Sequence, residues 1–408
     1  MAPPARTGRE RPRLLMVGGG IFQADMVRTA KRVGAEVWTV DRNPDAPAMH
    51  LSDHALPIDF GDVSAVLALE HIGFDGVTTA ASDAAIPTVV ACAHAWGLRA
   101  VSPDALRLCQ DKLRTMDALV EAGLPAASTR FISHDASVKP HIDAVCGYPF
   151  VIKPRFGAGG RGVSVVRTPE EVEPAVAKVL RHTPPEQGFL VQEFLRGQSV
   201  GVEAFLADGR IVRGVCLGDE YKSHFVSPIG HSLPAGLAPE IERDILAQVE
   251  RIAGVLGVTD GPMNFDLRYD HGEVWLIEAN ARLGGNSITE LVRVATGVDL
   301  GEVVVRAALG QSPEAALAPK HDVRPAAARL FVVRGHGMLE HLDGMRAWSE
   351  DPNVLAFELA SAGAPLTARV DEWAIVGRCL VRGASAQAAV ALAESIAADV
   401  EAHIRASA

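Results

Sequence analysis

The chain has 408 residues, of which 48% are hydrophobic and 22% are charged, a composition ordinary for a globular protein of about two to four domains. Its formal net charge of -11 argues against a general surface for nucleic acid or anionic membranes, and no run of residues is long and apolar enough to suggest a membrane span. The five cysteines are scattered without metal-type spacing, which fits a reducing compartment, and we expect a cytoplasmic protein.

Residues 1–12 contain several arginines and prolines but no apolar core, so we expect a flexible tail rather than a secretion signal. A short apolar strand follows at 13–17, then three glycines, a helix to about Val33 and a second strand that ends in Asp41. This order predicts a βαβ unit of Rossmann type. The glycine turn would suit a nicotinamide dinucleotide, but Gln23 stands where that motif needs a small residue. The alternative is a scaffold whose turn lines a substrate cleft or only joins two elements.

Apolar stretches at 76–79 and 98–101, with helical stretches between them, predict that the parallel α/β pattern continues to about residue 102. Ser102 and Pro103 then form a helix start, with the serine as N-cap. A second helix begins beside Lys112. A lone lysine on a helix is usually solvent exposed, so this residue receives no role from its position alone.

The stretch 148–155 is an apolar strand with Lys153 near its end, and a glycine-rich turn at 156–162 and a return strand at 163–166 follow it. This order predicts a flexible hairpin whose backbone N–H groups can close over phosphates, with the lysine supplying charge beneath it. It is not a Walker loop, because no Gly-Lys-Ser/Thr ends it and no helix follows directly. The alternative is a mobile glycine turn with a surface lysine.

The strand at 188–195 runs into a linker, and the strand at 199–206 continues the sheet. A strand edge that becomes a linker suits adenine, whose ring nitrogens pair with main-chain groups. The segment 221–234 is polar and interrupted by proline, unlike any regular element, and such loops often hold substrate. Its histidines, His224 and His231, either contact substrate or are solvated.

Residues 262–285 form the stretch around which we expect the site to be built. Alternating apolar and polar residues, a turn at 270–272 and an apolar return strand predict a β-hairpin. Asp266 and Glu278 share sequence parity, so in an even-sum register both carboxylates project from one face, with Asn280 beyond them. Oxygen ligands of this kind suit Mg²⁺. The alternative is a pair of solvated acids on an exposed sheet face.

Two glycines after the hairpin lead into a helix that begins near Ser287, and its free N–H groups would seat a carboxylate or a phosphate. From about Ala326 the pattern changes to short strands at 329–333 and 373–381 and a final helix at 385–404. This predicts a small α+β domain packed on the rest.

Taken together, these features resemble the ATP-grasp superfamily in their order and spacing over nearly the whole chain. The resemblance is carried by Lys112, Lys153, the glycine hairpin, the 192–195 stretch, Asp266 and the run from Glu278 to Arg282. Biotin carboxylase and carbamoyl phosphate synthetase look like distant relatives. The L-amino acid ligases look closer, because 229–234 and Arg282-Leu-Gly-Gly resemble their substrate-loop and post-metal patterns.

The resemblance implies a multidomain fold of α/β and α+β parts, with a Rossmann-like domain at 13–110, an ATP-grasp domain of two α+β subdomains at 111–315 and a small α+β domain at 316–408. It implies that nucleotide is bound by Lys112, Lys153, Gly157, Gly159, Gly160, Gly162, Glu193, Leu195 and Glu203. It implies that Mg²⁺, or Mn²⁺ in its place, is held by Asp266, Glu278 and Asn280. It implies that substrate is bound by His224, His231, Arg282, Gly284 and Gly285, with Arg282 and Lys153 as the catalytic groups.

Two departures from the family pattern concern the metal and the ribose. The first metal acid of the family is most often Glu, so Asp266 is one methylene shorter and the ion would sit differently. The ribose-binding acid that usually follows the linker is not evident at Gln198 or Ser199, which leaves the ribose contact without a residue.

The resemblance implies an ADP-forming ligase that activates an amino acid or related carboxylate as an acyl phosphate and joins it to an amine or a second amino acid. We expect ATP and Mg²⁺, small-molecule carboxylate and amine substrates, no nucleic-acid or membrane partner, and a homodimer as one admissible assembly. Competing hypotheses are a ligase that phosphorylates bicarbonate, a dehydrogenase that uses the glycine turn after 13–17, and a nucleotide-binding regulator without turnover. The complete set of acid, amide and arginine groups argues against the regulator, because binding alone does not need Arg282.

Overall fold

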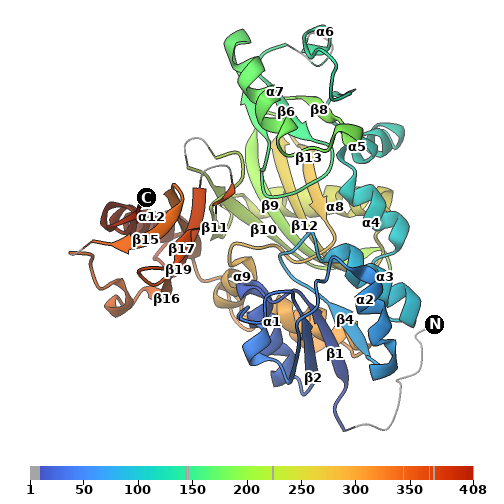
Figure 1. Ribbon diagram of the computed structural model, residues 1–408, viewed down its shortest axis with the longest axis vertical. Helices are drawn as coiled ribbons and strands as arrows, with labels where there is room; N and C mark the ends of the chain where they lie inside the picture. The colour runs from blue at the N-terminus through green and yellow to red at the C-terminus, as the bar shows by residue number, and fades with distance from the viewer. Residues whose placement is uncertain are drawn as a thin grey trace.

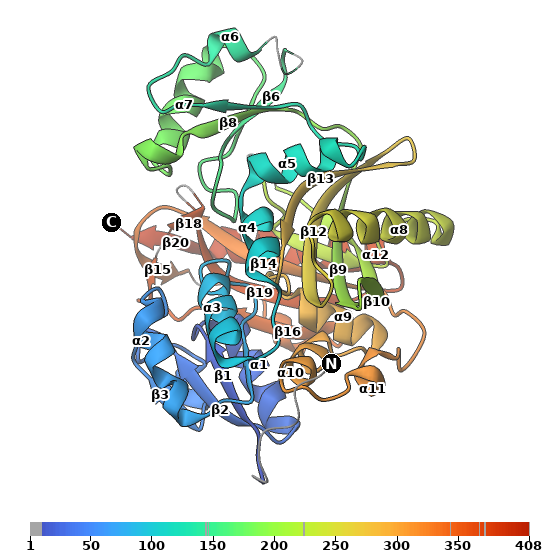
Figure 2. The same cartoon turned by 90° about the vertical axis from the view of Figure 1, so that its right-hand side faces the viewer.

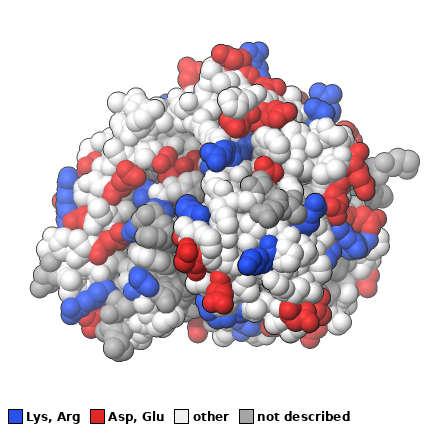
Figure 3. Space-filling model, turned by 90° about the horizontal axis from the view of Figure 1, so that it is seen from above, with Lys and Arg blue, Asp and Glu red and all other residues white. Residues whose placement is uncertain are grey.

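The structure is a computed structural model that describes residues 10–407 except 143, 144, 146, 223, 224, 343, 367, 371 and 372. Figure 1 shows the N-terminal domain in blue at the bottom, a green lobe at the top and the C-terminal part in red at the left, around a central sheet. In the part of the chain described, no helix has the length and apolar character needed to cross a membrane. On the face seen in Figure 3, positive and negative side chains are interspersed.

The N-terminal domain is built on a parallel sheet in the order β3-β2-β1-β4. Its strands are β1 (Arg13–Val17), β2 (Glu36–Val40), β3 (His54–Leu56) and β4 (Gly76–Thr78), and its helices are α1 (Ile21–Arg32), α2 (Val63–Leu67) and α3 (Ile86–Trp96). Both faces of β1 are buried: Leu14 and Met16 enter one core cluster, and Leu15 and Val17 enter another. Helices on both faces of a parallel sheet produce this pattern, and the predicted Rossmann-type opening is confirmed.

The strand predicted at 98–101 is absent from the structure. This stretch is an irregular connection between α3 and α4 (Pro103–Gln110). Its apolar residues Leu98 and Val101 are half-buried against neighbouring clusters. Helix α10 (Leu300–Ala308) packs against β4, the edge strand that a fifth strand would have had to extend, so the apolar residues serve packing between helices and not pairing in a sheet.

Helix α4 begins as predicted, with the Ser102 hydroxyl accepting the N–H of Ala105 at 3.1 Å. Asp111 is the N-cap of helix α5 (Lys112–Glu121). Its carboxylate accepts two hydrogen bonds from Arg155, at 2.7 and 2.6 Å. The N–H of Lys112 donates to the carbonyl of Arg155 at 3.2 Å. These contacts tie the first turn of α5 to the residue that follows β6 (Phe150–Pro154), and so bring two lysine-bearing segments together.

The upper lobe is a four-stranded antiparallel sheet in the order β5-β8-β6-β7. Its remaining elements are β5 (Thr129–Ile132), β7 (Ser164–Val166), β8 (Phe189–Glu193), α6 (Lys139–Ile142) and α7 (Val172–Leu180). Phe150, Ile152, Phe189 and Val191 are fully buried beneath α7. The glycine-rich turn therefore connects β6 to β7 in the hairpin that the sequence predicts.

The central sheet has nine strands, and all of its pairs are antiparallel. Its path runs β13-β12-β9-β10-β11-β14-β19-β16, with β18 paired to β19. The strands are β9 (Gln198–Ala207), β10 (Arg210–Glu220), β11 (Gly230–Leu233), β12 (Gly261–Asp270), β13 (Glu273–Asn280), β14 (Ala326–Arg334), β16 (Val354–Leu359), β18 (Ala368–Val370) and β19 (Trp373–Arg382). Helix α8 (Pro239–Val255) covers one face through Ile245, Val249 and Ile252. Figure 2 shows this sheet running behind the N-terminal domain.

Strand β11 corrects the expectation that 221–234 has no regular structure. Residues 230–233 are all buried and pair with β10 on one side and β14 on the other. The pairing partners lie far along the chain on one side, so local composition does not reveal the strand. The same ladder carries the sheet across residue 316, where we placed the start of the C-terminal domain.

The remaining elements close the structure around this sheet. They are α9 (Ile288–Thr296), α11 (Glu314–Leu317), α12 (Ala386–His403) and a small sheet of β17 (Pro365–Leu366), β15 (Gly337–His341) and β20 (Ile404–Ser407). The last helix packs on β14 and β19 through apolar residues such as Ala393 and Ile396. The largest core cluster joins α9, α10 and the N-terminal sheet to the central sheet. The multidomain α/β and α+β fold class is confirmed.

Candidate active site

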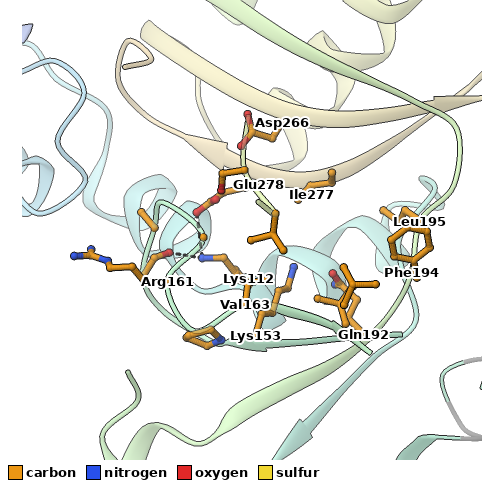
Figure 4. A pocket seen from close by; sticks show the side chains of 18 of the residues that line it. Lys112, Lys153, Arg161, Val163, Gln192, Phe194, Leu195, Asp266, Ile277 and Glu278 are labelled. Atoms are coloured by element: carbon orange, nitrogen blue, oxygen red, sulfur yellow. Dashed lines mark hydrogen bonds and ion pairs between the residues drawn. The ribbon is translucent and has the colours of Figure 1, made fainter. Parts of the chain in front are cut away.

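The hairpin of β12 and β13 has the register that places its two acids on one face. Asp266 pairs with Glu278, and Asn264 pairs with Asn280. Both carboxylates line a pocket of about 130 Å³ between the central sheet and the upper lobe, and Figure 4 shows them on the side of the pocket that faces Lys112. Asn280 lines an adjoining cavity of about 380 Å³, to which Glu278 also contributes.

The acids of this pocket repel one another. Burial raises the pKa of Asp266 to about 7, and the charges of Asp219 and Glu278 add to the effect. A divalent cation would relieve this repulsion, and two carboxylates with nucleotide phosphates are the ligand set that Mg²⁺ accepts in proteins. Among the described residues, no group of three or more His, Cys, Asp or Glu side chains is arranged to hold a metal alone. The donors present therefore fit a cation shared with phosphates rather than a closed protein cage.

Two lysines face these acids. Lys112 Nζ lies 3.1 Å from Glu278 Oε1 and donates to the carbonyl of Gly157, as Figure 4 shows. Lys153 is 4% exposed, and burial lowers its pKa to about 7, with repulsion from Lys112 as the next cause. A buried ammonium with this little compensation is stabilised by an anion. The pocket thus combines acids that favour a cation with lysines that favour phosphate.

The glycine hairpin forms the lid of the pocket. Gly157, Gly160 and Arg161 line it, whereas Gly159 and Gly162 do not. All four glycines have φ between +69° and +117°, a region that side chains rarely adopt. A Cβ at Gly160 would lie 2.6 Å from Ser227 Oγ, so the tip of the hairpin touches the segment before β11. The guanidinium-bearing Arg161 was not among the predicted site residues.

The opposite end of the pocket is apolar and ends at the linker after β8. Its walls include Val151, Val163, Val165 and Ile277, with Glu193, Phe194 and Leu195 at the rim. The carboxylate of Glu193 accepts the N–H of Ser128 at 3.2 Å, so it braces the linker. A slot of this shape beside a linker suits a flat purine ring.

Glu203 does not line the 130 Å³ pocket, although the family resemblance implied that it binds nucleotide. It is fully buried, and its Oε1 accepts the Asn264 amide at 2.7 Å and the N–H of Gly284 at 3.0 Å. Burial raises its pKa to about 8. On the sheet, Asp266 pairs with Gly201 and Asn264 pairs with Glu203. The glutamate therefore shares the acid-bearing face but lies one step further along, beneath the Gly284 backbone.

Arg282 lies at the end of the hairpin and turns toward the N-terminal domain. Its Nε and Nη2 each donate to Asp83 at 2.9 Å, and its Nη1 donates to Asn264 Oδ1 at 3.3 Å and to the carbonyl of Leu283 at 3.4 Å. Burial lowers the pKa of Arg282, but the ion pair with Asp83 and the charges of Glu203 and Glu278 together outweigh it and the net shift is upward. Asp83 borders the 380 Å³ cavity beside Glu278 and Asn280, whereas Arg282 itself lines a different pocket, next to β4 and α3.

The predicted substrate residues that the structure describes lie on different elements. His231 is buried in β11 and its Nδ1 lies 3.0 Å from Asp219 Oδ1, so it contacts a buried acid and not a free loop surface. His224 lies outside the described residues. Gly284 is packed on Glu203, with no room for a Cβ, and a Cβ on Gly285 would lie 3.5 Å from Ala81.

Sequence reasoning missed a hydrogen-bonded group next to the pocket. Asp219 Oδ2 accepts the Ser199 hydroxyl at 2.8 Å, and this hydroxyl lies 2.8 Å from that of Tyr221. Tyr221 and Arg268 both line the nucleotide pocket, with the guanidinium 5.8 Å from the ring centre. The pairing of β9 with β10 and with β12 brings these residues together, and the strand β10 was not predicted.

Family comparison agrees with this geometry. Residues 146–290 match the description "ATP-grasp domain", and residues 329–405 match "L-amino acid ligase C-terminal domain 2". Residues 146–290 therefore form an ATP-grasp domain. The closing part of the chain is of the type found in L-amino acid ligases.

Individual relatives are distant. The chain is 29% identical over 304 residues to the uncharacterized protein y4rH of Sinorhizobium fredii, which covers 72% of this chain and 61% of that protein, so the chain spans about three fifths of this relative. Its fold matches a crystal structure of L-amino acid ligase from Bacillus licheniformis with a TM-score of 0.77 at 22% identity, over 97% of this chain and 98% of the other. It also matches the biotin carboxylase domain of Hydrogenobacter thermophilus 2-oxoglutarate carboxylase, in complex with MgADP, ADP and bicarbonate, with a TM-score of 0.71 at 17% identity over 95% and 90%.

Proposed function

We propose that the chain is an ADP-forming ligase that activates an amino acid or related carboxylate as an acyl phosphate and joins it to an amine or a second amino acid. The observation that carries this proposal is the pocket in which Lys112, Lys153 and the glycine hairpin face Asp266 and Glu278. The match of residues 329–405 to an L-amino acid ligase domain supports the amide-forming branch.

The parts of the pocket divide the nucleotide between them. The apolar slot near Leu195 would hold adenine, and Lys112 and Lys153 would hold the phosphates under the glycine hairpin. Asp266 and Glu278, with Asn280 from the adjoining cavity, would hold Mg²⁺ or Mn²⁺. When bound, the cation would offset the charge of the phosphates and leave the lysines and acids of this chain to fix their orientation.

The chemistry runs in two displacements. A substrate carboxylate oxygen attacks the γ-phosphorus in line, the bond to the bridging oxygen breaks and ADP leaves, which yields an acyl phosphate. The nitrogen of a neutral amine then attacks the acyl carbon, the bond from that carbon to the phosphate oxygen breaks, the nitrogen gives up one proton to the departing phosphate or to water, and an amide remains. The closed glycine hairpin keeps water from the acyl phosphate. In this proposal Arg282 would stabilise the oxyanion of the second displacement.

A screen of substrate pairs tests this proposal. We expect ADP release with Mg²⁺ that requires a carboxylate and an amine together, with amino-acid pairs as the first set. A product whose mass equals the sum of both substrates less water would identify the amide. ATP turnover that is indifferent to every such pair would count against the ligase.

A second candidate is a carboxylase-type enzyme that phosphorylates bicarbonate and acts on a small metabolite. It is favoured by the likeness to the carboxylase domain in complex with MgADP and bicarbonate. ADP release that needs bicarbonate and no organic carboxylate would support it. Incorporation of labelled bicarbonate into a product separates it from the amide-forming reaction.

A further inference from the structure

The loop after β4 is joined to the end of the β12–β13 hairpin at two places. The N–H of Ala81 donates to the carbonyl of Leu283 at 3.0 Å, and Asp83 holds Arg282 through the paired contacts described above. The two segments lie about 200 residues apart in sequence. A carboxylate that meets Nε and Nη2 in parallel fixes the plane of a guanidinium as well as its position.

The glycine turn of the N-terminal domain supports this loop from below. Gln23 is 5% exposed and its amide donates to the carbonyl of Ala80. Ala81, the next residue, has φ of +55°, a conformation that an L-residue adopts only when its surroundings hold it. Gln23 thus has a structural task at the position where a dinucleotide-binding turn needs a small residue.

A second arm holds the other side of the same arginine. Asn264 accepts Arg282 Nη1 through its Oδ1, and its own amide donates to Glu203 at 2.7 Å. Since Glu203 is fully buried and also accepts the N–H of Gly284, the asparagine has one available orientation. The guanidinium is therefore gripped by β9 and β12 on one side and by the N-terminal domain on the other.

We propose that Asp83 is a positioning residue that fixes the guanidinium of Arg282 for its proposed role, and that the Gly18–Gln23 turn serves to hold the Asp83 loop instead of a dinucleotide. The inference rests on the proposed function, because the role of Arg282 is proposed there. It makes the active arginine depend on a residue from another domain. Without that carboxylate, Nε and Nη2 lose their acceptor and the long side chain regains alternative rotamers.

The first arm of the test observes the arginine directly. The full-length chain is labelled with ¹⁵N-arginine, and the Nε–H resonance of Arg282 is identified by its absence in Arg282→Lys. We expect slow exchange of this proton with water in the wild type and fast exchange in Asp83→Asn. Asp53→Asn is the matched control, because Asp53 is similarly exposed, at 23% against 28%, and forms ion pairs with Arg11 and Lys31 in the same domain.

The second arm measures turnover. Asp83→Asn should lower kcat about 10- to 100-fold with the KM for MgATP essentially unchanged, since the misplaced group acts in chemistry and not in nucleotide binding. Asp83→Glu should recover part of the loss. Gln23→Met, which keeps the volume and removes the amide donor, should give a smaller loss of the same kind. Thermal melting confirms that each variant is folded.

The outcomes separate this inference from the proposed function. Slow exchange that survives in Asp83→Asn, or that is absent in the wild type, overturns the inference. So does fast exchange in Asp83→Asn with wild-type turnover, or an equal loss of kcat in Asp53→Asn. A wild-type protein that releases no ADP with any carboxylate and amine would overturn the proposed function instead, and the exchange comparison would still decide whether Asp83 orients Arg282.

Discussion

Lys153 is a charge in an environment that disfavours charge. It is buried in β6, next to Lys112. The negative charge of Glu278, which also attracts Lys112, favours the charged form of Lys153. Such an arrangement costs stability in the free protein and becomes favourable when an anion arrives. For Asp266, burial and then the charges of Asp219 and Glu278 likewise disfavour the charged form of the side chain. A bound phosphate would therefore stabilise the lysine, and a bound cation would stabilise the acid.

We expect Lys153→Ala and Glu278→Ala each to lower turnover by about a hundred- to a thousandfold, the scale for losing one preorganised charge-stabilising contact. Lys139→Ala is the matched control, because this lysine is exposed on α6 in the same lobe. Steady-state ADP release at saturating MgATP measures the effect. Near wild-type rates in both site variants would mean that the site lies elsewhere.

The lowered pKa of Lys153, about 7, predicts a dependence of nucleotide binding on pH. The free lysine loses its charge as the pH rises through about 7, while bound phosphates favour the ammonium form. ADP affinity should therefore fall as the pH rises above about 7, and binding at about pH 8 should take up a proton. Calorimetry in two buffers of different ionisation enthalpy measures that uptake. Lys153→Met should abolish it, and an unchanged uptake would assign the titration to another group.

The glycine hairpin shows how an element can close without side-chain obstruction. Gly159 and Gly160 have nearly the same φ, +69° and +71°, but only Gly160 lies against another segment. A Cβ at Gly160 would lie 2.6 Å from Ser227 Oγ and 3.0 Å from Val226. A Cβ at Gly159 would have no neighbouring atom within 4 Å. Backbone strain and closure can therefore be separated by two substitutions at neighbouring positions.

Gly160→Ala should impair closure, so that the acyl phosphate meets water more often. We expect the ratio of ADP released to amide formed to rise above one, with a higher KM for ATP. Gly159→Ala carries the same backbone strain without the contact, and should leave that ratio near one. Quantification of both products in a single reaction provides the measurement. Equal ratios in the two variants would show that the tip contact does not govern closure.

Elements built from neighbouring residues could be predicted, and those built from distant ones could not. The β12–β13 hairpin and the β6–β7 hairpin follow from alternation and turn residues within one short window. Strand β11 pairs with β14, which begins 96 residues after β11 begins. For the same reason the pairing of Glu203 with Gly284 and of Asp83 with Arg282 was not foreseen. The chemical types of the pocket residues could be predicted from the sequence, but the contacts that orient them could not.

At the scale of the whole molecule, buried thiols report on how the parts open. Burial raises the pKa of the four described thiols to about 12, and these are Cys92, Cys109, Cys216 and Cys379. Cys109 and Cys216 belong to the core beneath the β12–β13 hairpin. The other two belong to the cores of the N-terminal and C-terminal domains. Each reacts with an alkylating reagent only when its surroundings open.

We expect MgADP to slow the labelling of Cys109 and Cys216 more than that of Cys92 and Cys379, because a ligand protects most strongly the core that its site adjoins. Mass spectrometry of alkylated peptides over time measures all four rates in one sample. Equal slowing of every thiol would instead show that the molecule opens as a single cooperative unit.

The ladder between β11 and β14 has a consequence for how such enzymes diversify. It joins Gly230 to Arg329 and Leu233 to Ala326, and three successive alanines of β14 lie along it. Three of the four paired residues on the β14 side are alanines, so that side demands little side-chain matching except at Arg329. A hybrid that takes its last 83 residues from a relative would therefore inherit a compatible joint, and substrate range could change by recombination in one event instead of by successive point substitutions.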